Sequence, residues 1–118
     1  MAINGAHMLL YTSEPEALRA MLRDVFGWKH VDAGGGWLIF QLPPAEVAVH
    51  PTDGPASHEL YLMCDDVARV VTELAAKGVE ATSPVDVRWG IVATITLPSG
   101  APLSIYEPRH PLARDLNG

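Results

Sequence analysis

The stretch that decides the fold is SHELYLMCDD, residues 57–66. Its first part, HELYLM, has the composition of a short apolar strand, and Asp65-Asp66 provides an acidic helix start directly after it. The helix that follows carries apolar residues three and four positions apart and ends at Lys77-Gly78. Three more strand candidates come next: VEAT (79–82), IVATITL (91–97) and PLSIYE (102–107). This half of the chain therefore predicts the order β-α-β-β-β.

The first half of the chain predicts the same order. A short apolar strand at 8–11 precedes a helix over 15–25, whose apolar positions again recur at three and four. Three strand candidates follow: WKHVDA (28–33), WLIFQL (37–42) and EVAVH (46–50). Gly34-Gly35-Gly36 has no phosphate-loop lysine after it and indicates a hairpin turn.

Two landmarks support an internal duplication. The histidines at 7 and 58 lie 51 positions apart, and so do the helix-ending glycines at 27 and 78. We therefore expect two modules, 5–51 and 56–108, in a single domain of 118 residues, followed by an exposed tail at 109–118.

Charge and composition exclude several classes of partner. The formal net charge is −6 and no basic cluster interrupts it, which argues against binding to nucleic acid. No apolar run approaches the roughly 20 residues that span a bilayer, and no signal-peptide pattern opens the sequence. The single cysteine, Cys64, cannot form an internal disulfide, so we expect a cytoplasmic protein without a membrane partner.

The two modules, the histidine that opens each of them and LPSGAPLSIYEP at 97–108 resemble the vicinal oxygen chelate superfamily. That superfamily contains glyoxalase I, extradiol dioxygenases and bleomycin-resistance proteins. The resemblance covers about residues 5–108. It implies an α+β fold in which two β-α-β-β-β modules form a cup-shaped, half-open barrel. It also implies a homodimer, in which modules pair within one chain or between chains.

The resemblance implies a candidate metal site. Metal-dependent members take ligands from the first and last strands of each module, and the matching positions here are His7, His50 and His58. The fourth position, usually a carboxylate, is Ser104, a poor ligand for a divalent ion. Glu107 lies three positions further on and should point away from the cup. Three imidazoles would suit iron, zinc, nickel or manganese; the alternative is a protein without a cofactor.

Antibiotic-binding relatives need no metal and enclose planar ligands between aromatic side chains. Tyr106 shares the Ser104 face of its strand and is the preferred aromatic lining residue, with Ser104 beside it. Trp37 and Trp89 occupy corresponding places before the third strand of their modules and are candidates for the entrance. Alternation from His58 places Tyr61 on the opposite face, outside the cup.

Two functions remain open at this point. The first is a binder that sequesters a hydrophobic or planar small molecule in the cup. The second is a metal-dependent enzyme, either an extradiol-type dioxygenase or a glyoxalase-type lyase or isomerase, which would use the histidines. We assign no catalytic residue, because Glu46 and Glu59 are expected to face away from the cup and no other carboxylate base is evident.

Overall fold

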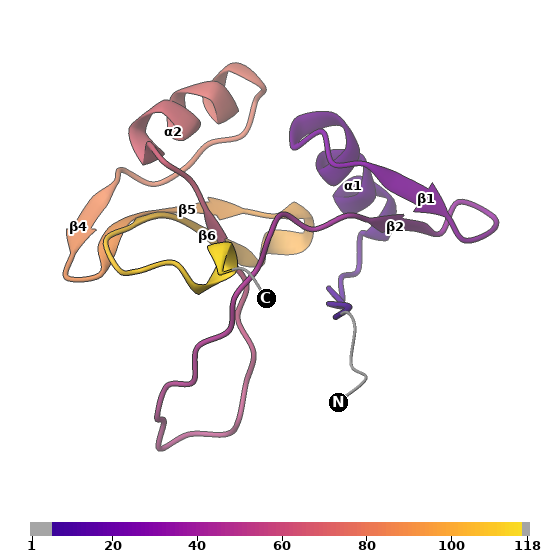
Figure 1. Ribbon diagram of the computed structural model, residues 1–118. Coiled ribbons are helices and arrows are strands. Elements are labelled where there is room, and N and C mark those ends of the chain that lie inside the picture. Colours follow the sequence, from indigo (N-terminus) through magenta and orange to yellow (C-terminus); the bar gives the residue numbers. More distant parts are fainter. Residues whose placement is uncertain (1–5, 117–118) are drawn as a thin grey trace.

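The structure is a computed structural model that describes residues 6–116. It is an α+β fold, as predicted, and its strands form one two-stranded and one four-stranded sheet (Figure 1). Among the described residues, the strands do not close into a barrel. The elements are α1 (Pro15–Ala20), β1 (His30–Asp32), β2 (Leu38–Phe40), β3 (Tyr61–Met63), α2 (Val67–Ala76), β4 (Val85–Val87), β5 (Gly90–Thr96) and β6 (Pro102–Pro108).

The second module forms one sheet in the order β3-β6-β5-β4. β3 runs parallel to β6, because α2 connects β3 to the rest of the sheet, and the other neighbours are antiparallel. The strand expected at 79–82 is wrong: only Ala81 there bridges to β5. The strand forms at β4 instead, because a turn at Arg88-Trp89 lets it pair directly with β5.

Two carboxylates fix the start of α2. Asp66 is the N-cap, and its side chain accepts a hydrogen bond from the backbone N–H of Arg69 at 3.1 Å. Glu107, from β6, accepts one from the N–H of Val67 at 3.1 Å. Negative charge is favoured at a helix N-terminus, so the predicted helix start after Asp65 is confirmed. Glu107 thus faces the helix, as its position three after Ser104 predicted.

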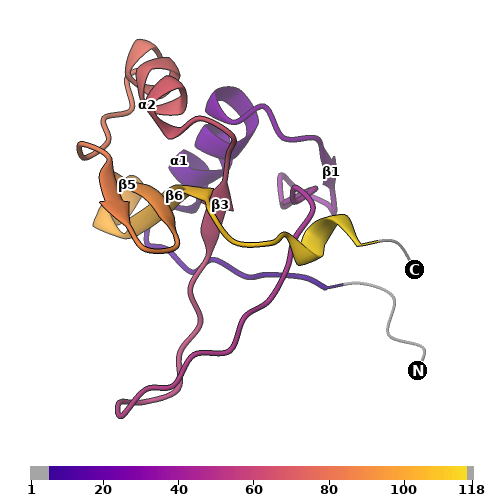
Figure 2. The same ribbon diagram turned by 60° about the vertical axis from the view of Figure 1, so that its left-hand side comes forward.

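The core lies between the four-stranded sheet and the two helices, which cover the same face of the sheet (Figure 2). Ile95 is fully buried at its centre. The other buried members of this cluster are Leu18 of α1, Leu74 of α2, and Leu97, Leu103 and Ile105 of the sheet region. Burial of these apolar side chains provides the main stabilisation of the second module.

The first module is only partly formed in the single chain. Its predicted helix is confirmed, with α1 continuing as a π-helical turn over Met21–Val25, and so is the glycine turn that joins β1 to β2. The strands expected at 8–11 and 46–50 are wrong for the single chain, since neither segment pairs with another strand. Strand pairing depends on partners distant in sequence, and within residues 6–116 no strand lies against either segment.

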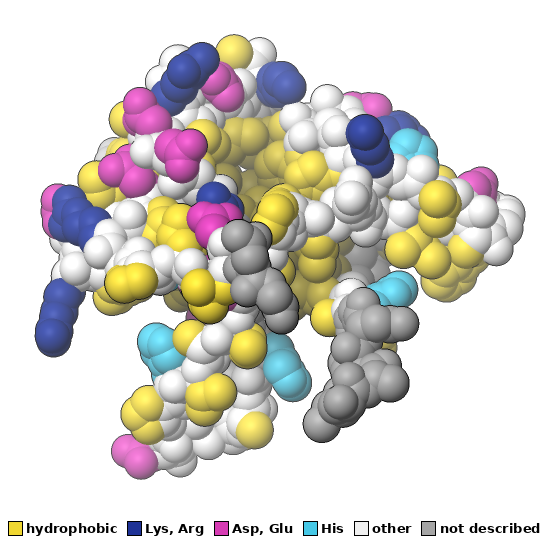
Figure 3. Space-filling model, in the orientation of Figure 1, with side chains coloured by type: hydrophobic (Ala, Val, Ile, Leu, Met, Phe, Trp, Pro, Cys, Tyr) yellow, Lys and Arg dark blue, Asp and Glu magenta, His cyan; other side chains and the backbone are white. Residues whose placement is uncertain are grey.

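Residues 43–58, which we call the arm, extend away from the rest of the molecule (Figures 1 and 3). Val47 and Val49 in the arm are 90% and 94% exposed. The radius of gyration is 15.5 Å, whereas a compact domain of this length would have about 13.5 Å. The chain is therefore less compact than is typical of a domain of this length. No helix in the described residues is long and apolar enough to cross a membrane.

Candidate ligand-binding cleft

A cleft of about 1250 Å³ runs along the free edge of β3. All three residues of β3 line it, so it reaches both faces of that edge strand. Other lining residues come from the arm, from α2, from the end of the first helix and from the C-terminal tail. Figure 3 shows a hollow between the two helices whose walls are hydrophobic side chains. The cleft thus has apolar side chains in its walls, and the segments that form these walls are far apart in the sequence.

Three aromatic rings form a cluster in this cleft, which we call the aromatic cluster: Tyr61, Trp89 and Tyr106. Each pair meets edge to face, with ring centroids 5.3–6.0 Å apart, the arrangement that aromatic quadrupoles favour. Tyr106 is 8% exposed, whereas Tyr61 and Trp89 are 39% and 42% exposed. The partly exposed Tyr61 and Trp89 therefore both pack against the buried Tyr106.

Tyr61 joins this cluster although alternation from His58 placed it on the opposite face. The register explains the difference: Tyr61 lies opposite Ser104 across the β3–β6 pair, so both share one face with Tyr106. β3 begins only at Tyr61, and residues 58–60 before it are not paired as a strand. Strict alternation therefore does not extend back to His58. The pairing partner of Tyr61, not its distance from His58, would have been the correct signal.

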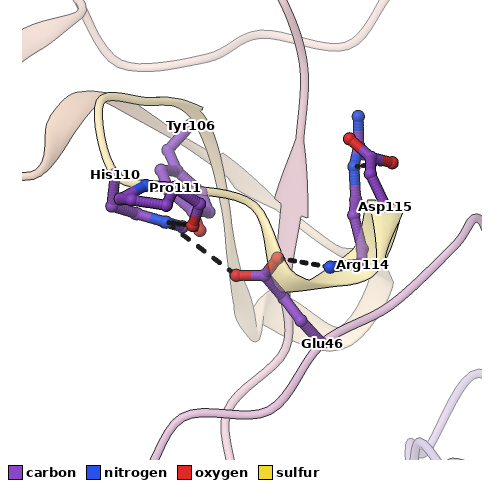
Figure 4. A network of polar contacts seen from close by, with 6 residues as sticks. All are labelled: Glu46, Tyr106, His110, Pro111, Arg114 and Asp115. Carbon is purple, nitrogen blue, oxygen red and sulfur yellow. Dashed lines mark hydrogen bonds and ion pairs between the residues drawn. The ribbon is translucent and has the colours of Figure 1, made fainter. Parts of the chain in front are cut away.

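A polar network lies beside the aromatic cluster and joins the arm to the tail (Figure 4). The Tyr106 hydroxyl lies 2.9 Å from Nε2 of His110, and Nδ1 of His110 lies 2.8 Å from the carbonyl of Pro111. The backbone N–H of Arg114 donates to Glu46 at 3.2 Å, and the other carboxylate oxygen of Glu46 is 4.0 Å from His110. The tail is therefore folded against the cleft at these residues and is not the fully exposed extension that was expected.

A hydrogen-bond acceptor beside His110 shows that its Nδ1 atom carries a proton. A carbonyl oxygen can only accept a hydrogen bond, so the short contact to Pro111 places the proton on Nδ1. Nε2 shares a second hydrogen bond with the Tyr106 hydroxyl. The Nδ1 proton is directed at Pro111 and not at Glu46.

Two glutamates line the cleft, although they were expected to face away from the cup. Glu46 lines it together with Ala48 and His50, whereas Val47 and Val49 do not. Residues 46 and 50 are an even number of positions apart and share one face of an extended segment, so the expectation for Glu46 was wrong. Glu59 precedes the strand and also lines the cleft, because alternation does not govern it there.

Burial raises the pKa of both tyrosines of the aromatic cluster. For Tyr61 the nearby charge of Glu59 adds to the increase. For Tyr106 the charge of Glu46 adds to it and that of Arg114 opposes it. Both phenols therefore stay protonated at neutral pH, where they act as hydrogen-bond donors and acceptors. Burial also raises the pKa of the Cys64 thiol, whose Sγ lies 3.6 Å from the Tyr106 carbonyl.

The other predicted ligand-binding residues are spread over the molecule. Trp89 lines the large cleft, whereas Ser104 lines a second cleft of about 380 Å³, where its hydroxyl is 3.4 Å from that of Thr94. Trp37 lines neither cleft. It is exposed, and the guanidinium carbon of Arg19 lies 5.0 Å from its ring centroid, a cation–π contact.

The predicted metal ligands do not meet within the single chain. His50 lines the large cleft, His58 lines the small one, and His7 lines neither. In residues 6–116, no group of three or more His, Cys, Asp or Glu side chains is placed to hold a metal ion. This donor set does not fit a metal in one chain, so we derive no step of chemistry through one.

The metal site itself stays a prediction, and metal analysis of untagged protein beside a His58→Ala variant tests it. Stoichiometric iron, zinc, nickel or manganese that disappears in the variant would support the site. Protein without metal, or with metal that the substitution leaves unchanged, would contradict it. A His30→Ala variant is the matched control, because His30 packs against Phe40 in the β1–β2 hairpin, apart from the predicted ligands.

Comparison with solved structures identifies the fold. TnmS3, an antibiotic-binding protein from Streptomyces sp. CB03234, superposes with a TM-score of 0.67 at 25% identity, over 92% of this chain and 98% of that one. A glyoxalase/bleomycin resistance protein from the same source matches with a TM-score of 0.56 at 25% identity, over 80% and 92% of the two chains. The chain has the fold of the vicinal oxygen chelate superfamily.

Both catalytic and binding members of the vicinal oxygen chelate superfamily are among its structural neighbours. A lactoylglutathione lyase from Agrobacterium tumefaciens matches with a TM-score of 0.62 at 21% identity, over 91% of this chain and 96% of that one, which shows the fold alone. The sequence matches no protein-family model and no curated protein. The choice between binding and catalysis therefore depends on the cleft itself.

Proposed function

We propose that this protein binds a planar, hydrophobic small molecule in the large cleft, on the aromatic cluster. One observation carries the proposal: Tyr61 and Trp89, each about two-fifths exposed, pack over the buried Tyr106 inside a cleft with both apolar and polar walls. Exposed aromatic faces in a concave, largely apolar site favour stacking with a flat ligand and its desolvation. The likeness to an antibiotic-binding protein supports the same conclusion.

The chemistry of the cleft favours binding over catalysis. Of the histidines expected as metal ligands, His50 and His58 line different clefts and His7 lines neither. The polar groups next to the aromatic cluster are paired with one another in a network that spans the arm and the tail. Such groups orient a ligand without transforming it.

We propose also that the protein acts as a homodimer, with the arm as part of the contact. The arm presents alternate residues to the cleft, and Val47 and Val49 point away from it into solvent. The segment at 8–11 is likewise apolar, exposed and without a strand partner. Large apolar side chains left in solvent on an extended, unpaired segment favour association with a second copy, which would cover them and pair the backbone.

A Trp89→Ala variant tests the binding proposal. We expect it to weaken the binding of planar aromatic compounds about tenfold or more, because loss of one stacked ring removes about 1–3 kcal/mol. Isothermal titration calorimetry against a panel of flat two-, three- and four-ring compounds measures the effect. A specific ligand should also raise the melting temperature of the unchanged protein, since it binds only the folded state.

Trp37→Ala is the matched control for that experiment, because Trp37 is an exposed tryptophan that lines neither cleft. Binding should be unchanged in this variant. If no compound of the panel binds, or if the two tryptophan variants behave alike, the proposed site is wrong.

A further inference from the structure

The first residues of the tail contact several parts of the molecule that form the large cleft. His110 lies against the hydroxyl of Tyr106, and the backbone N–H of Arg114 holds the arm through Glu46. Figure 4 shows Glu46 reaching the tail between these two tail residues. A further contact comes from Arg109 at the start of the tail, which holds the turn between β4 and β5. One short segment thus connects the sheet, the aromatic cluster and the arm.

Arg109 binds the turn between β4 and β5 with both its side chain and its backbone. Its guanidinium forms a bidentate contact with the carboxylate of Asp86, in which both N···O distances are 2.6 Å. Nη1 also donates to the carbonyl of Val87 at 3.2 Å, and the backbone N–H donates to the carbonyl of Trp89 at 3.0 Å. A bidentate contact fixes direction as well as distance. Arg109 holds the pKa of the Asp86 carboxyl below its usual range, so this ion pair is present at neutral pH.

The position of the Trp89 ring depends on this turn. The turn consists of Arg88 and Trp89, and Trp89 is 42% exposed, so packing of its own side chain holds it only in part. The ring meets Tyr106 and Tyr61 edge to face, with centroids 5.3 and 6.0 Å away, and such contacts depend on ring orientation. A shift of the turn would therefore change the surface that the aromatic cluster presents to a ligand.

The two residues that form the ion pair lie outside the site itself. Neither Arg109 nor Asp86 lines either cleft. Their side chains are 44% and 69% exposed, and exposed ion pairs contribute little to the stability of a fold. An effect of Arg109 on ligand binding would therefore act through the turn and Trp89, without a large change in the stability of the protein.

We propose that the tail organises the ligand-binding site, with Arg109 as a positioning residue that holds Trp89 in the orientation that a planar ligand needs for stacking. This inference rests on the proposed binding function and adds to it a residue from outside the cleft. A site whose rings are already fixed loses less conformational entropy when the ligand binds, which raises the affinity. The tail is thus part of the framework of the site.

An Arg109→Met variant tests this inference, because it keeps an unbranched side chain and removes the contact with Asp86. We expect its affinity for planar aromatic compounds, measured by calorimetry, to fall about fivefold, the effect of ordering one more side chain on binding. The melting temperature should change little. Asp86→Asn should also weaken binding. The double variant should bind no more weakly than Arg109→Met alone, since both substitutions break the same contact.

A signal from Trp89 itself distinguishes positioning from a general loosening of the structure. In protein labelled with 5-fluorotryptophan, the fluorine resonance of Trp89 is assigned with a Trp89→Phe variant. It should shift or broaden in Arg109→Met without any ligand, whereas the resonances of the other two tryptophans stay in place. Arg23→Met is the matched control, since Arg23 also contacts an aspartate, Asp24, through two hydrogen bonds of 2.8 Å and lines neither cleft. It should change neither the affinity nor the Trp89 resonance.

The outcomes separate this inference from the function on which it rests. If Arg109→Met leaves the Trp89 resonance or the affinity unchanged, Arg109 does not position the ring for the ligand and the inference is wrong. If Arg23→Met weakens binding equally, the loss comes from surface charge and the inference is again wrong. If no planar compound binds the unchanged protein, the proposed binding function is overturned, while the fluorine spectrum still decides whether Arg109 holds Trp89.

Discussion

A variant in which Val47 and Val49 are both replaced by aspartate is expected to be a monomer at concentrations where the unchanged protein is a dimer. Both side chains are almost fully exposed in the single chain, so the substitutions cost the folded monomer little. In the proposed dimer each new carboxylate would be buried without a partner, at about 2 kcal/mol or more. A homodimer would contain four such carboxylates, two from each chain, so association would weaken by much more than about a thousandfold. Sedimentation equilibrium measures the change.

Val85→Asp is the control for that experiment. Val85 is also an exposed valine on an extended segment, but it lies in β4, at the edge of the four-stranded sheet opposite β3. This variant should remain a dimer. If the Val47 and Val49 double variant also remains a dimer, the arm does not form the contact.

Gly90→Ala is expected to lower the free energy of unfolding by about 2 kcal/mol, from overpacking between β5 and β6. A Cβ added at this position would lie 2.5 Å from the carbonyl oxygen of Glu107 and 3.2 Å from Cδ2 of Tyr106. The backbone carbonyl cannot move without disturbing the strand that carries Tyr106. A fall in melting temperature of roughly 8 °C should follow, and affinity for planar ligands should decrease with it.

Gly54→Ala separates this packing effect from a general effect of replacing glycine. Gly54 lies in the arm, and a Cβ there would meet only Oγ1 of Thr52 at 3.6 Å, an ordinary contact. The melting temperature of the Gly54→Ala variant should stay close to that of the unchanged protein. Equal destabilisation by the two substitutions would contradict the close approach of β6 to Gly90.

The parts of the fold that depend on local chemistry could be predicted from the sequence. Gly27 and Gly78 both adopt positive φ where the helices end, and Asp66 caps α2, because these effects act within a few residues. The strands expected at 8–11 and 46–50 also have the local composition of strands. Their pairing, however, depends on partners distant in sequence, and composition carries no information about those partners.

The candidate site was less predictable for the same reason. Trp89 and Tyr106 were expected near a ligand and do line the cleft, whereas Tyr61 joins them through a register that only the β3–β6 pairing fixes. His110 and Arg114 lie in a tail whose prolines and charges are typical of an exposed extension. The hydrogen bond between Arg114 and Glu46 spans 68 positions of sequence. No periodicity connects residues so far apart.

The arm has a further consequence for the behaviour of the newly made chain. EVAVH, residues 46–50, combines β-branched apolar residues with an unpaired backbone, the kind of segment that stacks into fibrils. Pro43 and Pro44 precede it and Pro51 follows it, and proline has no backbone N–H to donate to a growing ladder. The prolines act as gatekeepers: they limit strand addition to the six residues between Pro44 and Pro51, which opposes the stacking of many copies.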